Sequence, residues 1–494
     1  MTKSSPNKPG HEHWFGLLLA SQRFAMMRSN VVILTFATFA GIARAFTCDG
    51  DAAEAALAAS EEAFRGLRTK GGWTRETGTL KFTHDLNDDA DISEYGYPGA
   101  MLYARPSFAG GLSPVFRLAP SDALVVVLCT PPETRYFGLS TYVWRRQGSL
   151  LPTSRVVSAS CGNAPVNSRT IRSGYPSFDR PLVMVSTGDA ATFSAVSDAF
   201  VAAGVPAESL NLEELPFERV NFGRSLILDR ADDLTFSYRV YDANTREYAK
   251  QAWKSVMIIR SPRGRTSKPE IAFPAAPPPP SVNLVRSERH LKYIAVALSD
   301  AIKRELLAKQ FRFSRRGRMI PVDVDRERCL SDPGYSPFRV GGASDVNIQS
   351  GCFGETSDCT YAVSSESIDA DDPFVVVFVG ADHVKLGNAA FSNLAAYHTG
   401  GAMRFISAAA VRVAAFADDR MWTRSDDTYV FAHAFASPGR CVVFRNMPDV
   451  PCVEVDAVRG DSTFFVSRDY LAPSGSAPDA EQLLPTSVDY YVPA

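Results

Sequence analysis

The chain has 494 residues, of which 45% are hydrophobic and 21% are charged, and its formal net charge at pH 7 is −2. A chain of this length can bury large hydrophobic cores, and its near-neutral charge excludes a global attraction to nucleic acid or anionic membranes. Beyond the N-terminal region no stretch approaches about 18 consecutive apolar residues, so we expect no membrane-spanning helix there.

The N-terminal region has the organisation of a secretory signal peptide. Arg23 and Arg28 precede the apolar stretch 31–43, which ends in small residues around Arg44 and is followed by Phe46. We therefore predict that residues 1–45 are a signal peptide with an N-terminal extension, and that the mature protein is secreted or enters an endomembrane lumen. The Ala-Arg-Ala-Phe junction also resembles the signal-peptide end of plastid-directed leaders of algae with complex plastids, so entry into a plastid through a secretory-type leader is the alternative. The acidic residues that follow Phe46 argue against a transit segment.

All eight cysteines follow the predicted cleavage point, and their even number in a secreted chain favours disulfides over free thiols. The pairs that we predict, two from short spacing and two by elimination, are Cys352–Cys359 and Cys441–Cys452, then Cys129–Cys161 and Cys48–Cys329. Because no C-x₂-C motif occurs, we predict no metal site, and no cofactor motif is present either.

The first half of the chain mixes helical and β-like segments. Residues 51–68 are rich in alanine and glutamate and predict a helix. Val125–Leu128 is an apolar run typical of a buried strand, and Tyr136–Trp144 alternates as a second strand. Leu182–Ser186 predicts a further strand, followed by an amphipathic helix that Asp189 caps. This mixture predicts an α+β fold.

A proline-rich segment divides the chain. Residues 261–283 carry no periodicity and contain four consecutive prolines, which is typical of a semi-rigid linker. An amphipathic helix over Ser287–Gln310 follows. We therefore predict a first α+β domain over 46–260 and a second over 284–494.

The two halves resemble each other. The segment DALVVVL at 122–128 matches DPFVVVF at 372–378 without a gap, and Tyr136-x₅-Tyr142 matches Phe391-x₅-Tyr397. A looser match joins the two segments that begin Asp-Asp, 232–236 and 426–429. We therefore hypothesise two related β-rich units with a few amphipathic helices; the alternative is that apolar strands look alike by chance. Different strand orders in the two units would refute the hypothesis.

One histidine stands where a sheet can present a reactive group. His383 follows the predicted strand 374–379, and Asp382 is its neighbour. In the internal match His383 aligns with Glu133, whose turn also carries Arg135. If the units face each other, we expect His383, Asp382 and Glu133 to form a catalytic group, with Arg135 as a ligand-binding residue. The alternatives are a structural, hydrogen-bonded histidine and an Arg–Glu pair that closes a turn.

Two short runs carry a resemblance to other proteins. The segments CTPPETRYFG at 129–138 and HVKLGNAAFSN at 383–393 resemble parts of uncharacterised secreted proteins from microbes and algae. The resemblance implies a secreted α+β protein, and it implies no substrate and no catalytic residue.

The strongest local charge is basic and follows the helix of the second half. Arg312, Arg315, Arg316 and Arg318 lie within seven residues and offer contact with an anionic polymer. The alternative is a solvated helix end.

Two functions remain open. The first is a non-catalytic binding protein, which the scarce histidines and the missing catalytic motifs favour. The second is a hydrolase or lyase that uses His383 with a nearby carboxylate. The enzyme needs His383 exposed in a pocket beside a carboxylate, and the binding protein does not.

Overall fold

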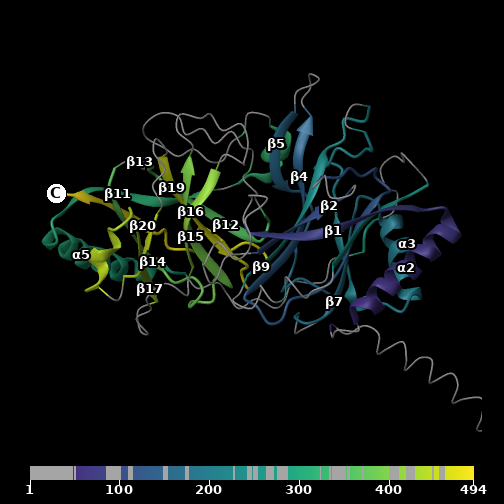
Figure 1. The fold of residues 1–494 in the computed structure, drawn as a ribbon, viewed down its shortest axis with the longest axis horizontal. Helices are drawn as coiled ribbons and strands as arrows, with labels where there is room; N and C mark the ends of the chain where they lie inside the picture. Colours follow the sequence, from purple (N-terminus) through teal and green to yellow (C-terminus); the bar gives the residue numbers. More distant parts are fainter. Residues whose placement is uncertain are drawn as a thin grey trace, which may run out of the picture. The chain divides into compact units, whose positions relative to one another are not determined.

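The chain divides into two compact units, Met1–Arg44 and Ala45–Ala494. A computed structural model describes residues of the second unit, and the predicted leader, like most of the predicted linker, lies outside the described residues (Figure 1). The described residues are 48, 52–84, 102–108, 115–147, 154–172, 177–225, 228–241, 248, 254–262, 272–274, 287–322, 324–332, 335, 352, 356–369, 372–399, 411–418, 429–447, 450–455 and 462–494. None of the helices in these ranges is long and apolar enough to cross a membrane.

The first half of this unit forms one sheet with helices beside it. Its described elements are α2 (Ala52–Gly71), β1 (Thr74–His84), β2 (Leu102–Ser107), β3 (Ala123–Cys129), β4 (Tyr136–Gln147), β5 (Ser154–Ser160), β6 (Val166–Asn167), β7 (Pro181–Thr187), α3 (Ala190–Ala202), η2 (Ala207–Ser209), β8 (Leu210–Glu214), β9 (Asp233–Tyr241) and β10 (Lys254–Arg260). The predicted cap of α3 is confirmed, because the Asp189 carboxylate accepts the N–H groups of Ala191 and Thr192.

The second half forms another sheet. Its described elements are η3 (Arg289–Leu291), α5 (Lys292–Ala308), β11 (Phe311–Val322), α6 (Arg326–Ser331), β12 (Cys359–Ser364), β13 (Ile368–Asp369), β14 (Val375–Ala381), β15 (Phe391–Thr399), β16 (Val411–Asp418), β17 (Val430–Ala436), η5 (Cys441–Phe444), β18 (Cys452–Glu454), β19 (Ser462–Tyr470) and β20 (Ser487–Pro493). The predicted α+β fold with β-rich units is therefore confirmed.

The two sheets have the same topology. The first runs β5-β4-β9-β2-β1-β10-β3-β7-β8, and the second runs β16-β15-β19-β12-β11-β20-β14-β17-β18. If β6 and β13 are set aside, the strands of each half correspond one to one in chain order, and both sheets then have one strand order. Each neighbouring pair is antiparallel except the last, β7–β8 and β17–β18, which is parallel in both. Different strand orders would have refuted the hypothesis of two related units, and the strand orders are the same.

One part of the internal match was wrong. Asp233 begins β9, whose counterpart is β19, whereas residues 426–429 lead into β17, whose counterpart is β7. Both segments place acidic residues before an aromatic residue, so their likeness does not mark corresponding strands.

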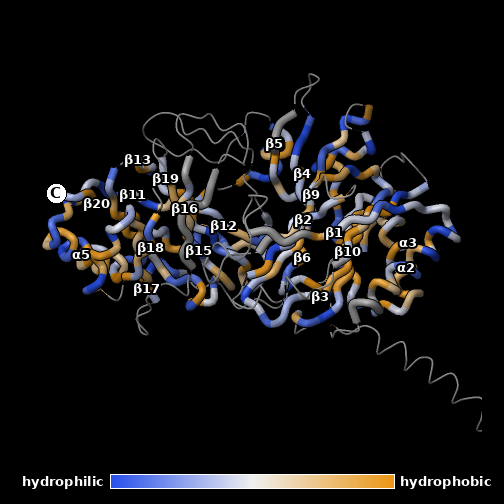
Figure 2. The backbone as a smooth tube through the Cα atoms, viewed as in Figure 1, coloured by the Kyte–Doolittle hydropathy of each residue, from blue (hydrophilic) through white to orange (hydrophobic). Residues whose placement is uncertain are grey.

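In the gapless match between the two halves, matched residues also lie on corresponding faces of the two sheets. Central strands are covered on both sides, so alternate residues enter different cores. Val125 and Val127 of β3 pack with α2 and α3, and the hydrophobic character of this region is visible in Figure 2. Their counterparts in β14, Val375 and Val377, pack with α5. The second sheet has the short η5 between β17 and β18, where the first sheet has α3 between β7 and β8.

Aromatic rings join the halves in a reciprocal arrangement. Tyr241 stacks on Phe391 with ring centroids 3.6 Å apart, and Tyr136 lies 4.8 Å from Tyr470. Tyr136 pairs with Tyr241 across β4 and β9, and Phe391 pairs with Tyr470 across β15 and β19, so the two pairs are counterparts. Tyr136 therefore contacts Tyr470, which is the counterpart of its strand partner Tyr241. In the same way, Tyr241 contacts Phe391, which is the counterpart of its strand partner Tyr136. Such a reciprocal arrangement is also found at the interface of a two-fold symmetric dimer.

A segment of the second half packs into the core of the first. Cys329, Leu330 and Cys352 join the hydrophobic core between the strands of the first sheet, and the Arg146 guanidinium donates to the Leu330 carbonyl. The first sheet ends at Arg260 and the second begins at Phe311, which is compatible with the predicted boundary over 261–283. That boundary stays a prediction.

The disulfides correct most of the predicted pairing. Cys441–Cys452 forms as predicted. The other bonds are Cys48–Cys129 and Cys329–Cys352, so the predicted pairs Cys352–Cys359, Cys129–Cys161 and Cys48–Cys329 were wrong. Cys161 and Cys359 are buried free thiols. Spacing along the chain misled here because Cys352 meets helix α6, which lies upstream, whereas Cys359 begins a core strand.

Thiol labelling tests this assignment. Burial raises the pKa of the Cys161 and Cys359 thiols, so iodoacetamide should leave both unmodified in the native protein and alkylate both after denaturation. Peptide mapping without reduction should recover the three bonds listed above. A peptide linking Cys352 to Cys359 would contradict the structure.

Candidate functional site

His383 lies in the turn between β14 and β15, and its ring is buried. The residue is 5% exposed. Its Nδ1 lies 2.8 Å from Oε1 of Glu288, and its Nε2 lies 3.9 Å from Oδ2 of Asp469. Both ring nitrogens therefore face carboxylates that come from distant segments of the chain.

Glu288 is the centre of this group. It precedes η3 and is fully buried, and besides His383 its carboxylate accepts the Asn388 side-chain amide at 2.8 Å and the Leu484 N–H at 2.7 Å. Burial acts to raise the pKa of Glu288, but the charge and hydrogen bond of His383 prevail and lower it. Glu288 is therefore held as a carboxylate.

The ring of His383 is held as a cation. Burial acts to lower its pKa, but the charges of Asp469 and Glu288 outweigh burial and raise it to about 9. Burial raises the pKa of Asp469, which also accepts a hydrogen bond from Ser392 at 2.5 Å. A general base must be free to accept a proton near neutral pH, and a protonated ring between two carboxylates is not.

The predicted partners of His383 lie elsewhere. The Asp382 carboxylate is buried and accepts the Lys385 N–H at 2.9 Å, which fixes the turn after β14. Glu133 is exposed in the turn before β4 and forms no ion pair with His383, and the half-buried Arg135 lies in that same turn. The expected convergence of Glu133, Arg135 and His383 is therefore not seen; the carboxylates beside the ring are Glu288 and Asp469.

The first half holds a disulfide where the second half holds this ion pair. Cys48 lies four residues before α2 and is bonded to Cys129 at the end of β3. Glu288 lies four residues before α5 and is bonded to His383, just beyond β14. Since α2 and β3 are the counterparts of α5 and β14, both links tie the segment before the helix to the same end of the corresponding strand. The contact of His383 with Glu288 thus links the segment before α5 to the sheet.

Two of the four arginines after α5 form ion pairs. Arg316 lies 2.7 Å from Asp489, and Arg315 lies 3.6 Å from Glu366. Arg312 and Arg318 are exposed on the same strand, β11. The four arginines therefore do not form one uncompensated surface.

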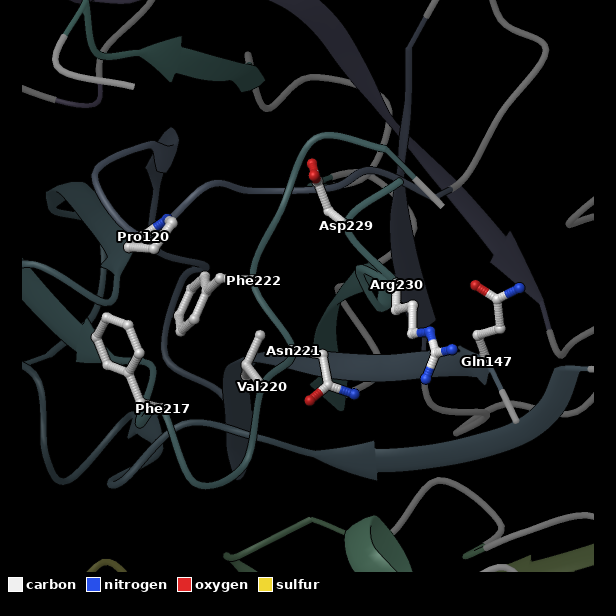
Figure 3. Close-up of a pocket in the computed structure, with 8 residues that line it drawn as sticks. All are labelled: Pro120, Gln147, Phe217, Val220, Asn221, Phe222, Asp229 and Arg230. Carbon is white, nitrogen blue, oxygen red and sulfur yellow. The ribbon is translucent and has the colours of Figure 1, made fainter. Parts of the chain in front are cut away.

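A pocket of about 530 Å³ opens on the first half, near the end of β4 (Figure 3). It receives Gln147 from β4, residues 217–222 from the loop after β8, and residues 229–230 from the loop before β9. We call it the Gln147 pocket. Its lining residues are Pro120, Gln147, Phe217, Val220, Asn221, Phe222, Asp229 and Arg230.

A buried ion pair holds the walls of the Gln147 pocket in place. The Asp232 carboxylate is fully buried and bonds the Arg146 guanidinium, which also donates to the Arg219 carbonyl at 2.6 Å. The Asn221 N–H donates to Asp232 at 2.8 Å. Strand β4 and both loops are thereby joined beneath the pocket, so the site is preformed. No sequence pattern indicates the Gln147 pocket, because Asp232 is recognisable from the sequence only as the start of a strand.

The polar groups of the pocket are incompletely paired. The Gln147 side-chain oxygen is buried and has no hydrogen-bond partner among the described residues. Figure 3 shows Phe217 and Phe222 toward one end of the pocket and Arg230 and Gln147 toward the other. The site therefore combines an apolar end with a polar end, as small-molecule sites commonly do.

Metal chemistry finds no support in the described ranges, where no group of three or more histidine, cysteine, aspartate or glutamate side chains is placed to hold an ion.

Comparisons with known proteins add no function. No family model and no curated protein matches the chain. Among solved structures, an uncharacterised protein from Burkholderia cenocepacia is 11% identical, with 92% of this chain and 96% of that chain covered, at a TM-score of 0.34. Broad Bean Stain Virus gives a TM-score of 0.16 at 8% identity, covering 85% of this chain and 87% of that one. A tandem domain of Paenibacillus barcinonensis Xyn10C gives 0.14 at 9% identity, with 86% and 93% covered. At TM-scores this low, none of these carries an argument about this chain.

Proposed function

We propose that the protein is a non-catalytic binding protein of an extracellular or lumenal compartment, and that it holds a small molecule in the Gln147 pocket. The observation that carries the proposal is the buried Gln147 oxygen, which no donor from the described residues reaches. A buried polar atom without a hydrogen bond costs about 1–3 kcal/mol, so native proteins rarely keep one. A hydrogen-bond donor on a bound ligand offsets that cost, and in the absence of ligand a water molecule that the ligand later displaces does the same.

The rigidity of the walls supports the proposal. Asp232, Arg146 and the Asn221 N–H fix the pocket from below, so a ligand does not have to order the loops before it binds. The three disulfides fit an oxidising compartment and therefore the predicted secretory leader.

The catalytic alternative has less support. A hydrolase or lyase that used His383 would satisfy one requirement, since a carboxylate lies within hydrogen-bond reach of the ring. It would not satisfy the other, because the ring is buried and its pKa is raised to about 9. We therefore favour the binding protein.

Filling the pocket tests the proposal. In ligand-observed NMR against a library of small-molecule fragments, the wild type should give binders that Asn221→Trp loses, because an indole at this exposed lining residue occupies the pocket. Asn163→Trp is the matched control: Asn163 is also exposed, accepts one side-chain hydrogen bond from Arg219, and does not line the pocket. It should keep every binder.

Two results would refute the proposal. One is a library in which no fragment binds the wild type. The other is a set of fragments that bind the wild type and Asn221→Trp equally well.

A further inference from the structure

We infer that the Gln147 pocket selects an aromatic carboxylate that carries a hydrogen-bond donor on the carbon beside the carboxylate, such as an aromatic 2-hydroxy acid. This inference rests on the proposed function, because it names the chemical class of ligand for the same pocket.

Arg230 supplies the positive charge. Its side chain is exposed and forms no hydrogen bond or ion pair within the described ranges. A guanidinium binds a carboxylate through two parallel hydrogen bonds, which makes the pair both strong and directional. An unpaired guanidinium in the lining of a pocket therefore indicates an anionic group on the ligand.

The backbone conformation of Arg230 also supports a role in binding. Its φ is 51°, in the left-handed region that non-glycine residues seldom occupy. Such a conformation is strained for an arginine, whereas glycine adopts it without strain. Strained residues concentrate at binding sites, where their side chains are used.

Gln147 supplies the acceptor. Its buried oxygen lies in the same polar end as Arg230 in Figure 3 and needs a donor. A carboxylate has none, so the ligand must carry a hydroxyl or ammonium group close to its carboxylate. A group on the adjacent carbon satisfies both residues at once.

Phe217 and Phe222 receive the apolar part. Their ring centroids are 4.9 Å apart and the rings are tilted by 47°. Both side chains are half-buried and lie at the other end of the pocket in Figure 3, with Val220 and Asn221 between the two ends. An aromatic ring fits this end through offset or edge contacts.

Asp229 does not oppose an anionic ligand. Its carboxylate accepts the N–H groups of Arg224 and Ser225 at 2.8 and 3.0 Å, and in Figure 3 it points away from Arg230. Its charge is therefore partly offset by the backbone.

The test compares matched probes by isothermal titration calorimetry on the full chain. 3-Phenyllactate should bind the wild type, and its methyl ester should bind about 10- to 100-fold more weakly, because it loses the charged hydrogen bonds to Arg230. 3-Phenylpropionate, which lacks the hydroxyl, should bind about 2- to 10-fold more weakly, because Gln147 then lacks a donor. Phenylalanine distinguishes an ammonium donor from a hydroxyl donor.

The variants Arg230→Gln and Arg230→Gly complete the test. Both should weaken the binding of 3-phenyllactate about 10- to 100-fold and should weaken that of its uncharged methyl ester much less. Arg230→Gly should melt at the temperature of the wild type or above it, since the strain at φ 51° is relieved, so a binding loss in this variant is not a folding defect.

Binding of the ester as tight as that of the acid, or equal affinity of the wild type and Arg230→Gln for 3-phenyllactate, would overturn this inference. In either case, a fragment that binds the wild type but does not bind Asn221→Trp would still support the proposed function. If the fragment screen itself gave no binder, the proposed function and this inference would fail together.

Discussion

Replacing His383 with alanine should destabilise the protein by about 3–5 kcal/mol, one of the two largest effects that we expect from a single substitution. The change leaves the fully buried Glu288 carboxylate without its cationic partner, and only the neutral donors of Asn388 and Leu484 remain. Urea denaturation followed by tryptophan fluorescence measures the loss. His290→Ala is the control, because His290 is exposed and, among the described residues, its ring forms a hydrogen bond with the nearby Ser287 carbonyl. Its cost should be below about 0.5 kcal/mol.

The double variant Glu288→Gln/His383→Gln separates loss of charge pairing from loss of packing. Removing both charges leaves no unpaired ion at the position of Glu288, so the double variant should lose less stability than the sum of the two single substitutions. Strict additivity would show that the two residues do not interact in solution.

The pH dependence of this stability has a definite sign. The pKa of His383 is raised to about 9 in the folded protein, against an ordinary value of about 6.5, so the folded state holds the proton more tightly. The stabilisation is therefore fully present below about pH 6.5 and is lost as the pH rises through about 9. The pKa of Glu288 is lowered, so its contribution is present above its ordinary value and is lost in acid.

The difference in unfolding free energy between the wild type and His383→Gln should therefore shrink between about pH 6.5 and pH 9. Using this difference cancels other titrations, such as that of the buried His433, whose pKa is lowered to about 3. A difference that stayed constant over the interval would contradict the ion pair.

Phe391→Ala should cost about 3–5 kcal/mol and should also loosen the contact between the halves. Phe391 is fully buried, stacks on Tyr241 of the first half, and lies 5.5 Å from Tyr470. Hydrogen exchange should accelerate in β9, where Tyr241 lies, by more than the global loss of stability explains. Phe378→Ala is the matched control: Phe378 is equally buried, but its ring contacts are Phe435 and Phe465 of its own half.

A double-mutant cycle between Tyr241→Ala and Phe391→Ala isolates the stack itself. Aromatic pairs contribute about 0.5–1.5 kcal/mol beyond the area that they bury, and we expect a coupling energy in that range. No coupling, with β9 exchange unchanged in Phe391→Ala, would mean that the halves are held together elsewhere.

Local features of the fold were predictable because short-range chemistry determines them. Asp189 caps α3 through bonds that reach only three residues along the chain. The apolar run Val125–Leu128 became a strand buried on both faces because no polar residue interrupts it. The matched spacing of Tyr136 and Phe391 located two strands that are counterparts in the sheets.

The candidate site was not predictable in the same way, because its partners are distant in sequence. Glu288 lies 95 residues from His383, and nothing in the segment around it marks a buried carboxylate. From the sequence we expect His383 to act with its neighbour Asp382, but the Asp382 carboxylate accepts the Lys385 N–H within its own turn. The cysteine pairing failed for the same reason: Cys48 and Cys129 are 81 residues apart and meet only because a helix returns to the sheet. The Gln147 pocket is made of loops without periodicity, so no pattern pointed to it.

The two links before the first helices, one a disulfide and the other an ion pair, respond to different chemical variables. A reductant cleaves Cys48–Cys129 and leaves Glu288–His383 intact, whereas alkaline pH deprotonates His383 and leaves the disulfide intact. Two copies of one topology are thus linked at the same end of corresponding strands, one by a bond sensitive to reduction and the other by an ion pair sensitive to pH. Each of these two links can be opened by a solvent condition that leaves the other link intact.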